Sequence, residues 1–265
     1  MDGVLSQEEI NALLNNNDAA DSSDEILTES EKDAIGEIAN ISMGTAATTL
    51  FSLVNRRVEI STPVVSFSNW DKIVDEYEKP CVFIKIGYTQ GLNGSNILVL
   101  KEKDVKIITD LMMGGDGTNI NGEIGELHLS AISEAMNQMM GSSATSLSSM
   151  LNRTIDISPP IAEVVDLKNT LNEGEIDSFL SEEFVKISFH MEIGDLVDSE
   201  IMQLYPPAFV KEMCKGVSQN MELDTQSVTE DVPQSSNTAT QAAPIQQPQD
   251  SGSMNNASAN SQGMI

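Results

Sequence analysis

The chain has 265 residues with 40% hydrophobic and 4% aromatic content, and its 14 basic and 41 acidic side chains give a formal net charge of -27. This composition predicts a globular core in one or two domains. The charge argues against nucleic-acid binding, which needs basic side chains to displace counterions from phosphates, and disfavours anionic membranes. The sequence contains neither a signal-peptide pattern nor an apolar run long enough to span a bilayer, so we expect a cytoplasmic protein.

Residues 1–16 predict a short amphipathic helix. Ser6 is a good N-cap, and Glu9 completes a capping box three residues later. The apolar stripe of this helix is formed by Leu5, Ile10, Leu13 and Leu14. Residues 17–25 are polar and predict a flexible linker. A helix this short is marginal alone in water. It either docks on its own domain or serves as a tethered recognition peptide for a groove on a partner, and we favour the tethered peptide.

Residues 26–216 predict the folded domain, built from two units at about 29–117 and 122–216. The first unit is predicted to contain a helix at 29–54, a strand at 58–66, a variable stretch around Trp70, strands at 81–88 and 95–100, and a helix at 103–113. The second is predicted to repeat this order, with a helix at 125–151, strands at 155–158, 185–193 and 199–204, and a final helix at 207–215.

Two units of the order α-β-β-β-α, with hairpins at their centres, predict an α+β fold. We expect pseudo-two-fold symmetry, an antiparallel sheet covered by helices, and two long helices as equivalent surface elements. Residues 217–265 are mostly Ser, Gln, Asn, Ala, Thr and Pro, a composition that predicts a disordered tail or a linker.

The two units share a duplicated segment. Residues 33–63 and 130–160 align without a gap and are identical at 15 of 31 positions. The alignment matches the pattern Asp33-x3-Glu37-x2-Asn40-x22-Pro63 with Ser130-x3-Glu134-x2-Asn137-x22-Pro160. Polar residues are therefore kept in both copies together with the apolar ones.

Helical geometry places the repeated polar residues on one side of each long helix. At about 100° per residue, Asp33, Glu37, Asn40 and Gly44 lie within one narrow stripe, opposite a packing face. The second helix repeats this stripe with Ser130, Glu134, Asn137 and Gly141. Glycine is unfavourable inside a helix, so the two glycines suggest that something approaches the backbone closely there, and a bulky partner is one candidate.

The residues give little support for nucleophilic or metal-dependent catalysis. We expect Cys81 and Cys214 to be buried free thiols, and His128 and His190 to have structural roles. Hydrolysis of a phosphoryl group is different, because a positioned water and charge neutralisation can carry most of the acceleration. An amide side chain can accept a hydrogen bond from such a water and donate one to a phosphoryl oxygen. A carboxylate one turn away is suited to contact a cationic side chain of the phosphorylated partner.

With this pattern present twice, the chain resembles the CheC/CheX/FliY family of response-regulator phosphatases over residues 26–216. The N-terminal sequence LSQEEINALL is similar to the peptide by which the flagellar switch proteins FliM and FliY bind phosphorylated CheY. The resemblance implies a CheY-phosphate phosphatase in which Asn40 and Asn137 orient the attacking water, while Glu37 and Glu134 anchor CheY. It implies no cofactor of the chain's own, since the Mg²⁺ in that reaction is supplied by CheY.

The family also implies a place for the protein, at the cytoplasmic face of the flagellar basal body, with FliM, FliG and FliN-like switch proteins as candidate partners. FliY proteins resemble three-part chains that end in a FliN-like domain, and we expect no such domain after Lys215. A non-enzymatic switch or adaptor protein that only captures phosphorylated CheY is the alternative function.

Overall fold

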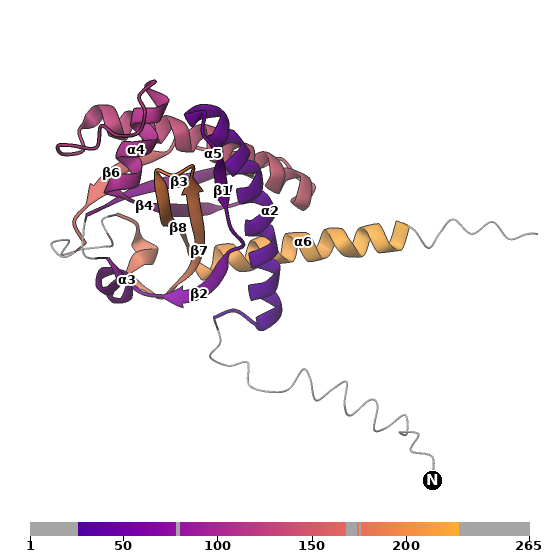
Figure 1. The fold of residues 1–265 in the computed structure, drawn as a ribbon. Helices are drawn as coiled ribbons and strands as arrows, with labels where there is room; N and C mark the ends of the chain where they lie inside the picture. The colour runs from indigo at the N-terminus through magenta and orange to yellow at the C-terminus, as the bar shows by residue number, and fades with distance from the viewer. Residues whose placement is uncertain (1–25, 78–79, 168–173, 175, 228–265) are drawn as a thin grey trace, which may run out of the picture.

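The computed structural model describes residues 26–77, 80–167, 174 and 176–227 (Figure 1). Its strands are β1 (Val58–Ile60), β2 (Val64–Ser68), β3 (Cys81–Gln90), β4 (Gly94–Lys101), β5 (Asp156–Ile157), β6 (Ile161–Val165), β7 (Phe184–Ile193) and β8 (Val197–Tyr205). Its helices are α2 (Glu29–Val54), α3 (Trp70–Glu76), α4 (Glu102–Met112), α5 (Glu126–Leu151) and α6 (Pro207–Ser227), with a 3-10 turn, η2 (Ser178–Ser181). The predicted α+β class is confirmed.

The strands form one sheet in the order β1-β7-β8-β4-β3-β5, with β2 also paired to β7 and β6 also paired to β3. All of these pairs are antiparallel. At the centre, β4 of the first unit meets β8 of the second, where Leu98 lies opposite Gln203. Each unit places its first strands against the other unit's hairpin, so the two units are interlocked and share one sheet.

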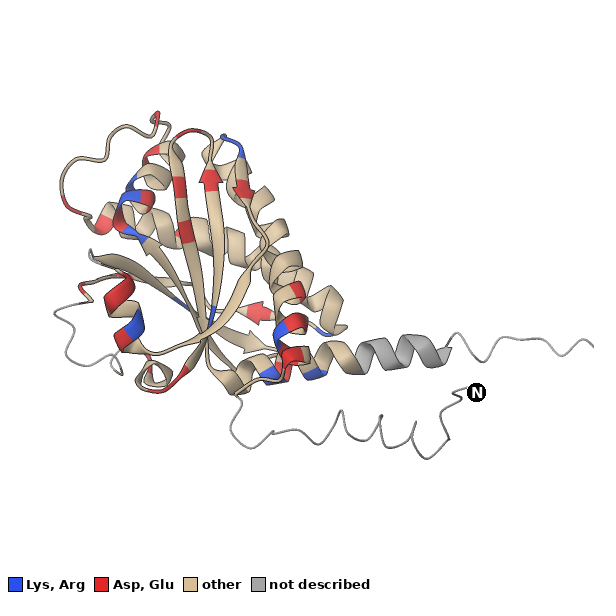
Figure 2. Ribbon diagram, turned by 60° about the horizontal axis from the view of Figure 1, so that its bottom comes forward, with Lys and Arg blue, Asp and Glu red and all other residues tan. Residues whose placement is uncertain are grey.

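Helices cover the sheet on both faces. One face packs with α2, α4, α5 and α6 into the larger core. The other face packs with α3 and η2 into a smaller core that contains Trp70, Phe83 and Phe184. Burial on both faces explains why the central strands carry near-continuous apolar runs, such as residues 81–84, where a one-sided sheet would alternate. Acidic positions outnumber basic ones over the described ribbon (Figure 2).

The two long helices pack against each other over the larger core (Figure 1). Thr49 of α2 donates a hydrogen bond to Ser142 of α5, with 2.8 Å between the two Oγ atoms. Beneath the helices, the Gln203 amide nitrogen lies 3.3 Å from the Met43 sulfur and 4.0 Å from the Met140 sulfur. Met43 and Met140 occupy equivalent positions in the repeat, so Gln203 links both helices near the pseudo-two-fold axis.

Four details differ from the sequence-based expectation, and the first is that strand β6 is not among the predicted elements. The predicted strand at 58–66 is wrong as one element, because it is broken into β1 and β2. The variable stretch around Trp70 forms α3, whose first turn is capped by Asn69, since the Asn69 side chain accepts from the Lys72 N–H at 3.1 Å.

The predicted end of the last helix at 215 is also wrong, because α6 continues to Ser227 and projects beyond the sheet (Figure 1). Gly216 looks like a helix stop in the sequence. In the structure it marks close packing, since a Cβ placed on Gly216 would lie 2.7 Å from Leu151 Cδ2. The division of the chain into domains at residue 216 remains a prediction.

Candidate functional site

The register of α2 is set at its N-terminus. Thr28 Oγ1 accepts from the Glu31 N–H at 3.2 Å, and Glu31 Oε2 accepts from the Thr28 N–H at 2.9 Å, which completes a capping box. With the helix beginning there, Asp33 and Glu37 are exposed and Asn40 is half-buried, while the opposite side of the helix is buried. The predicted polar stripe is therefore present on the surface of α2.

A bulge between β1 and β2 brings Pro63 to this stripe. Residues 61–63 lie opposite only residues 189–190 of β7, so the edge strand carries one extra residue. Ser61 secures the bulge, because its N–H donates to the His190 carbonyl at 2.9 Å and its Oγ accepts from the His190 N–H at 3.1 Å. Pro63 has no N–H to pair, which suits the first position after the break.

Helix and bulge together line a hollow of about 380 Å³. Its lining comprises Glu29, Lys32, Asp33, Gly36, Glu37, Asn40, Thr62, Pro63 and Val65. We call Asp33, Glu37, Asn40 and Pro63 the first site. Within the described residues, the Asn40 amide and the two carboxylates of this site have no hydrogen-bond or ion-pair partner. These groups are thus available to an incoming molecule.

The second copy builds the same arrangement on α5. Residues 158–160 lie opposite residues 86–87 of β3, which is again a bulge of one residue. The Ser158 N–H donates to the Gly87 carbonyl at 2.8 Å, and Ser158 Oγ accepts from the Gly87 N–H at 3.2 Å. Pro160 follows and is buried at the start of β6. The bulge, like the motif, is therefore present in both copies.

We call Ser130, Glu134, Asn137 and Pro160 the second site. Ser130 and Glu134 are exposed and Asn137 is half-buried, as in the first copy. Glu134 differs from its counterpart because its Oε1 accepts a hydrogen bond from the Gln138 side chain at 2.7 Å. The Asn137 amide has no partner in the part of the chain that the structure describes.

The surroundings of the two sites differ although the motif is shared. The first site has a lysine at its rim, where Lys32 Nζ lies 2.5 Å from Glu29 Oε1 and 5.2 Å from the centre of the Phe67 ring. The corresponding pairs in the alignment are Lys32 and Leu129, Asp33 and Ser130, Gly36 and Ser133, Ile41 and Gln138, and Thr62 and Pro159. The first site is consequently more charged along its helix than the second.

The two stripe glycines face open space. A Cβ placed on Gly44 or Gly141 would meet nothing within 4 Å. Packing within the described chain therefore does not require glycine at either position. Close approach of a partner remains our prediction for both.

Sequence reasoning missed two repeated pairs that shape the sites. Asn55 and Asn152 end α2 and α5 in the left-handed region, with φ of 49° and 47°. Ser61 and Ser158 secure the bulges. The signal was present in the alignment, because both pairs are identical in the two copies.

Other candidate groups have structural surroundings. Cys81 and Cys214 are buried thiols outside any disulfide, and burial raises the pKa of each to about 11. His128 Nδ1 accepts from the Gly125 N–H at 3.2 Å at the start of α5, whereas His190 is half exposed on β7. Among the described residues, no group of three potential metal ligands comes together, and no helix is long and apolar enough to cross a membrane.

The predicted CheY-binding peptide lies outside the described residues. Its candidate contact residues are Leu5, Ser6, Glu9, Ile10, Leu13 and Leu14.

Comparison with known proteins matches the two motif segments and most of the chain. The model of the CheC-like family matches residues 31–67 and 127–164, which contain both sites. The flagellar motor switch phosphatase FliY of Bacillus subtilis is 47% identical over 218 residues, covering 80% of this chain and 57% of the relative. The CheY-P phosphatase CheC of the same organism is 24% identical over 143 residues, covering 52% of this chain and 67% of CheC.

Solved structures agree with the sequence relatives. The sequence in the crystal structure of Thermotoga maritima FliY is 40% identical to that of this chain. The two structures match with a TM-score of 0.68, and the match covers 74% of this chain and 99% of that chain. A chain of the FliG–FliM complex of H. pylori shares the fold at 14% identity, with a TM-score of 0.57 over 71% of this chain and all of that chain. This chain spans 57% of the length of the B. subtilis FliY relative. Sequence, fold and the doubled motif together show that the chain is a FliY-like member of the CheC-like family.

Proposed function

We propose that this chain hydrolyses the aspartyl phosphate of the chemotaxis response regulator CheY, at or near the flagellar motor switch. The observation that carries the proposal is the pair of matching surface sites on equivalent helices. Each has an exposed glutamate and an asparagine amide without a hydrogen-bond partner among the described residues. The named functions of the B. subtilis relatives, a switch phosphatase and a CheY-P phosphatase, support it.

Asn40 and Asn137 have the chemistry that this hydrolysis needs. Phosphoryl transfer passes through a loose transition state, so placing a water in line with the leaving aspartate supplies much of the acceleration. The amide oxygen accepts a hydrogen bond from that water, and the amide nitrogen donates to a phosphoryl oxygen. The regulator brings the Mg²⁺ that neutralises charge on the phosphoryl group.

Glu37 and Glu134 act beside the reacting atoms. A carboxylate repels the phosphoryl group, so its useful partner is a lysine or arginine of the regulator. Glu37 has no partner among the residues that the structure describes, whereas Glu134 has to exchange its hydrogen bond from Gln138 for one to the regulator. We infer that this ion pair sets the register in which the asparagine one turn away enters the active site of the regulator.

The N-terminal peptide is proposed to hold the substrate near both sites. Residues 1–16 would bind phosphorylated CheY and residues 17–25 would act as the tether. A flexible tether of this kind raises the local concentration of the regulator to roughly the millimolar range. The switch proteins FliM, FliG and FliN-like proteins are the proposed assembly partners.

The test is phosphate release from acetyl-phosphate-charged CheY with Asn40→Ala, Asn137→Ala and the double variant. Each single variant should keep part of the activity, and the double variant should lose about 100-fold or more, because both water-positioning amides are gone. Asn121→Ala is the matched control, since Asn121 is an exposed asparagine outside both sites. Full activity of the double variant would refute the assignment of the two amides.

A second arm separates the phosphatase from an adaptor that only binds the regulator. Deletion of residues 1–25 should slow hydrolysis at low CheY concentration and leave it intact at saturation, because only the tether is lost. If neither the full chain nor the deletion variant accelerates loss of the phosphoryl group, the adaptor function stands and the phosphatase proposal fails.

A further inference from the structure

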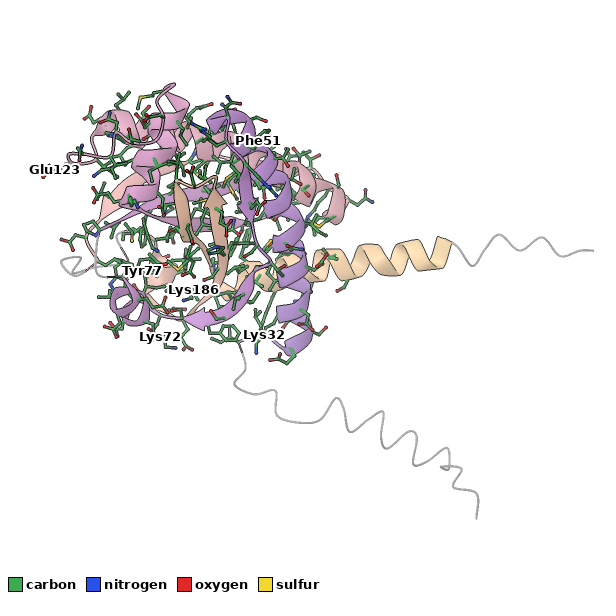
Figure 3. All side chains as sticks on the ribbon, viewed as in Figure 1. Lys32, Phe51, Lys72, Tyr77, Glu123 and Lys186 are labelled. Carbon is green, nitrogen blue, oxygen red and sulfur yellow. The ribbon has the colours of Figure 1, made fainter. Side chains whose placement is uncertain are left out.

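A second hollow lies on the same side of α2, beyond the first site. It has a volume of about 600 Å³ and runs between the second half of α2 and β1. Among its lining residues are Gly44, Thr48 and Phe51 from α2, together with Arg57, Ile60 and His190. We call it the Phe51 groove. Phe51 is 47% exposed, an unusual position for a phenylalanine, and lies toward the opposite end of α2 from Lys32 (Figure 3).

The groove continues the first site. Gly44 follows Asn40 by one helical turn on the same stripe, and Ser61 precedes the Thr62 and Pro63 that line the first site. Phe51 is 11 residues beyond Asn40, which corresponds to about 16 Å along the helix at 1.5 Å per residue. Gly44 has no side chain, and a Cβ placed on it would meet nothing within 4 Å, so this position of the stripe is open.

The second copy keeps apolar residues at most of the apolar positions of this groove but lacks its phenylalanine. Phe51 corresponds to Ser148, whose Oγ donates to the Ala144 carbonyl at 2.8 Å and accepts from the Ile155 N–H at 2.9 Å. Ile41, which is 43% exposed beside the first site, corresponds to Gln138. The duplication has therefore kept the glutamate and asparagine in both copies, while positions 51 and 41 carry exposed apolar side chains only in the first copy.

We propose that the Phe51 groove is a docking surface for the phosphorylated regulator when it is engaged at the first site, with Phe51 and Ile41 as apolar contacts. This inference rests on the proposed function. A specific interface buries about 800 Å² on each partner, a patch of roughly 16 Å radius. A regulator centred on Asn40 would thus extend about as far as Phe51, and aromatic side chains are enriched among the residues that contribute most to protein interfaces. The first site would bind the regulator more tightly than the second.

The first experiment replaces each of the two exposed apolar residues with its counterpart in the second copy. Full-length protein carrying Asn137→Ala, so that only the first site works, receives Phe51→Ser or Ile41→Gln, and phosphate release is measured against the concentration of phosphorylated CheY. We expect KM to rise about tenfold for Phe51→Ser and less for Ile41→Gln, with kcat within about twofold, because the contacts bind substrate without touching the reacting atoms.

Val164→Ser is the matched control for this series. Val164 is 43% exposed on β6, at the other end of the sheet from β2, so its substitution should leave KM of the first site unchanged. Phe51→Ser in an Asn40→Ala background should likewise leave the second site unchanged. An unchanged KM in the Asn137→Ala background, or an equal rise in the Asn40→Ala background, would overturn the inference.

Failure of the docking surface can be distinguished from failure of the proposed phosphatase function. If the Asn40→Ala, Asn137→Ala double variant stays active, the proposed function itself fails. If that variant is inactive but Phe51→Ser changes nothing, only the docking surface fails. A photoreactive phenylalanine analogue at position 51 gives a readout that needs no altered activity. Crosslinking to phosphorylated CheY supports the inference, whereas crosslinking only to residues 1–25 or to a second copy of the chain contradicts it.

Discussion

Asn55 and Asn152 show how single residues shape both sites. They are the non-glycine residues with positive φ in the described part of the chain, and each ends one of the two long helices. The Asn55 N–H donates to the Phe51 carbonyl, and the Asn152 N–H donates to the Ser148 carbonyl. Asparagine tolerates the left-handed conformation better than most residues, so the chain can leave each helix and turn back toward the edge of the sheet.

Replacing a cap residue should show whether the asparagine stabilises the helix end through its backbone conformation or through contacts of its side chain. Asn152→Ala is expected to lower the free energy of unfolding by about 1 kcal/mol, because alanine is strained at positive φ. Asn152→Gly should be neutral or slightly stabilising, since glycine adopts this region freely. Urea unfolding of both variants tests this, with Asn121→Ala as a surface control. Equal losses for alanine and glycine would show that the side chain, and not the backbone conformation, stabilises the cap.

At the scale of elements, the bulge decides where each proline lies. The sequence predicts one strand across residues 58–66. Pairing with β7 interrupts that strand, since Ser61 uses both its N–H and its Oγ on His190. His190 is 129 residues away, so no local pattern reveals this pairing. The repeat of Ser61 as Ser158 was the available clue.

Ser61→Ala should affect the first site more than the fold. In the Asn137→Ala background, we expect stability to fall by about 1 kcal/mol through the lost hydrogen bond. We also expect kcat to fall several-fold, because Pro63 shifts against the helix that carries Asn40. Phosphate release and thermal unfolding are the measurements. Ser61→Thr retains the hydroxyl and serves as the control. Unchanged kcat in the alanine variant would mean that the bulge does not position the site.

At the scale of the whole molecule, the buried carboxyl of Asp104 and the half-buried carboxyl of Asp177 have pKa values shifted in opposite directions. Burial raises the pKa of Asp104 at the start of α4, where Oδ2 has no hydrogen-bond partner in the described chain. Burial also favours the neutral form of Asp177, but hydrogen bonds from Lys85 and Ser95, each 2.8 Å long, outweigh it and lower the pKa of this carboxyl. Asp177 thereby ties the turn before η2 to the sheet.

These two residues should give pH effects of opposite sign. A lowered pKa in the folded state contributes stability above the unfolded pKa that is lost as pH falls, so Asp177→Asn should cost about 1 kcal/mol near neutral pH and less in acid. A raised pKa contributes stability at low pH that is lost as pH rises, so Asp104→Asn should stabilise the protein near neutral pH, with the gain shrinking in acid. Urea unfolding between pH 7 and pH 4 tests both. The same sign for both variants at pH 7 would contradict this account.

The sequence by itself determined the duplication, the two polar stripes, the central hairpins and the family. These features depend on helical and strand periodicity and on identity between the copies, both of which can be read along the chain. Three features could be seen only in the tertiary structure. The first strands of each unit pair with the hairpin of the other unit, a bulge interrupts both edge strands at the same position, and the Phe51 groove lies beside the first site. These features arise from contacts such as Ser61 with His190 and Leu98 with Gln203, which join residues more than 100 positions apart. Local propensity contains no information about such pairs, because their energies depend on which surfaces the whole fold brings together.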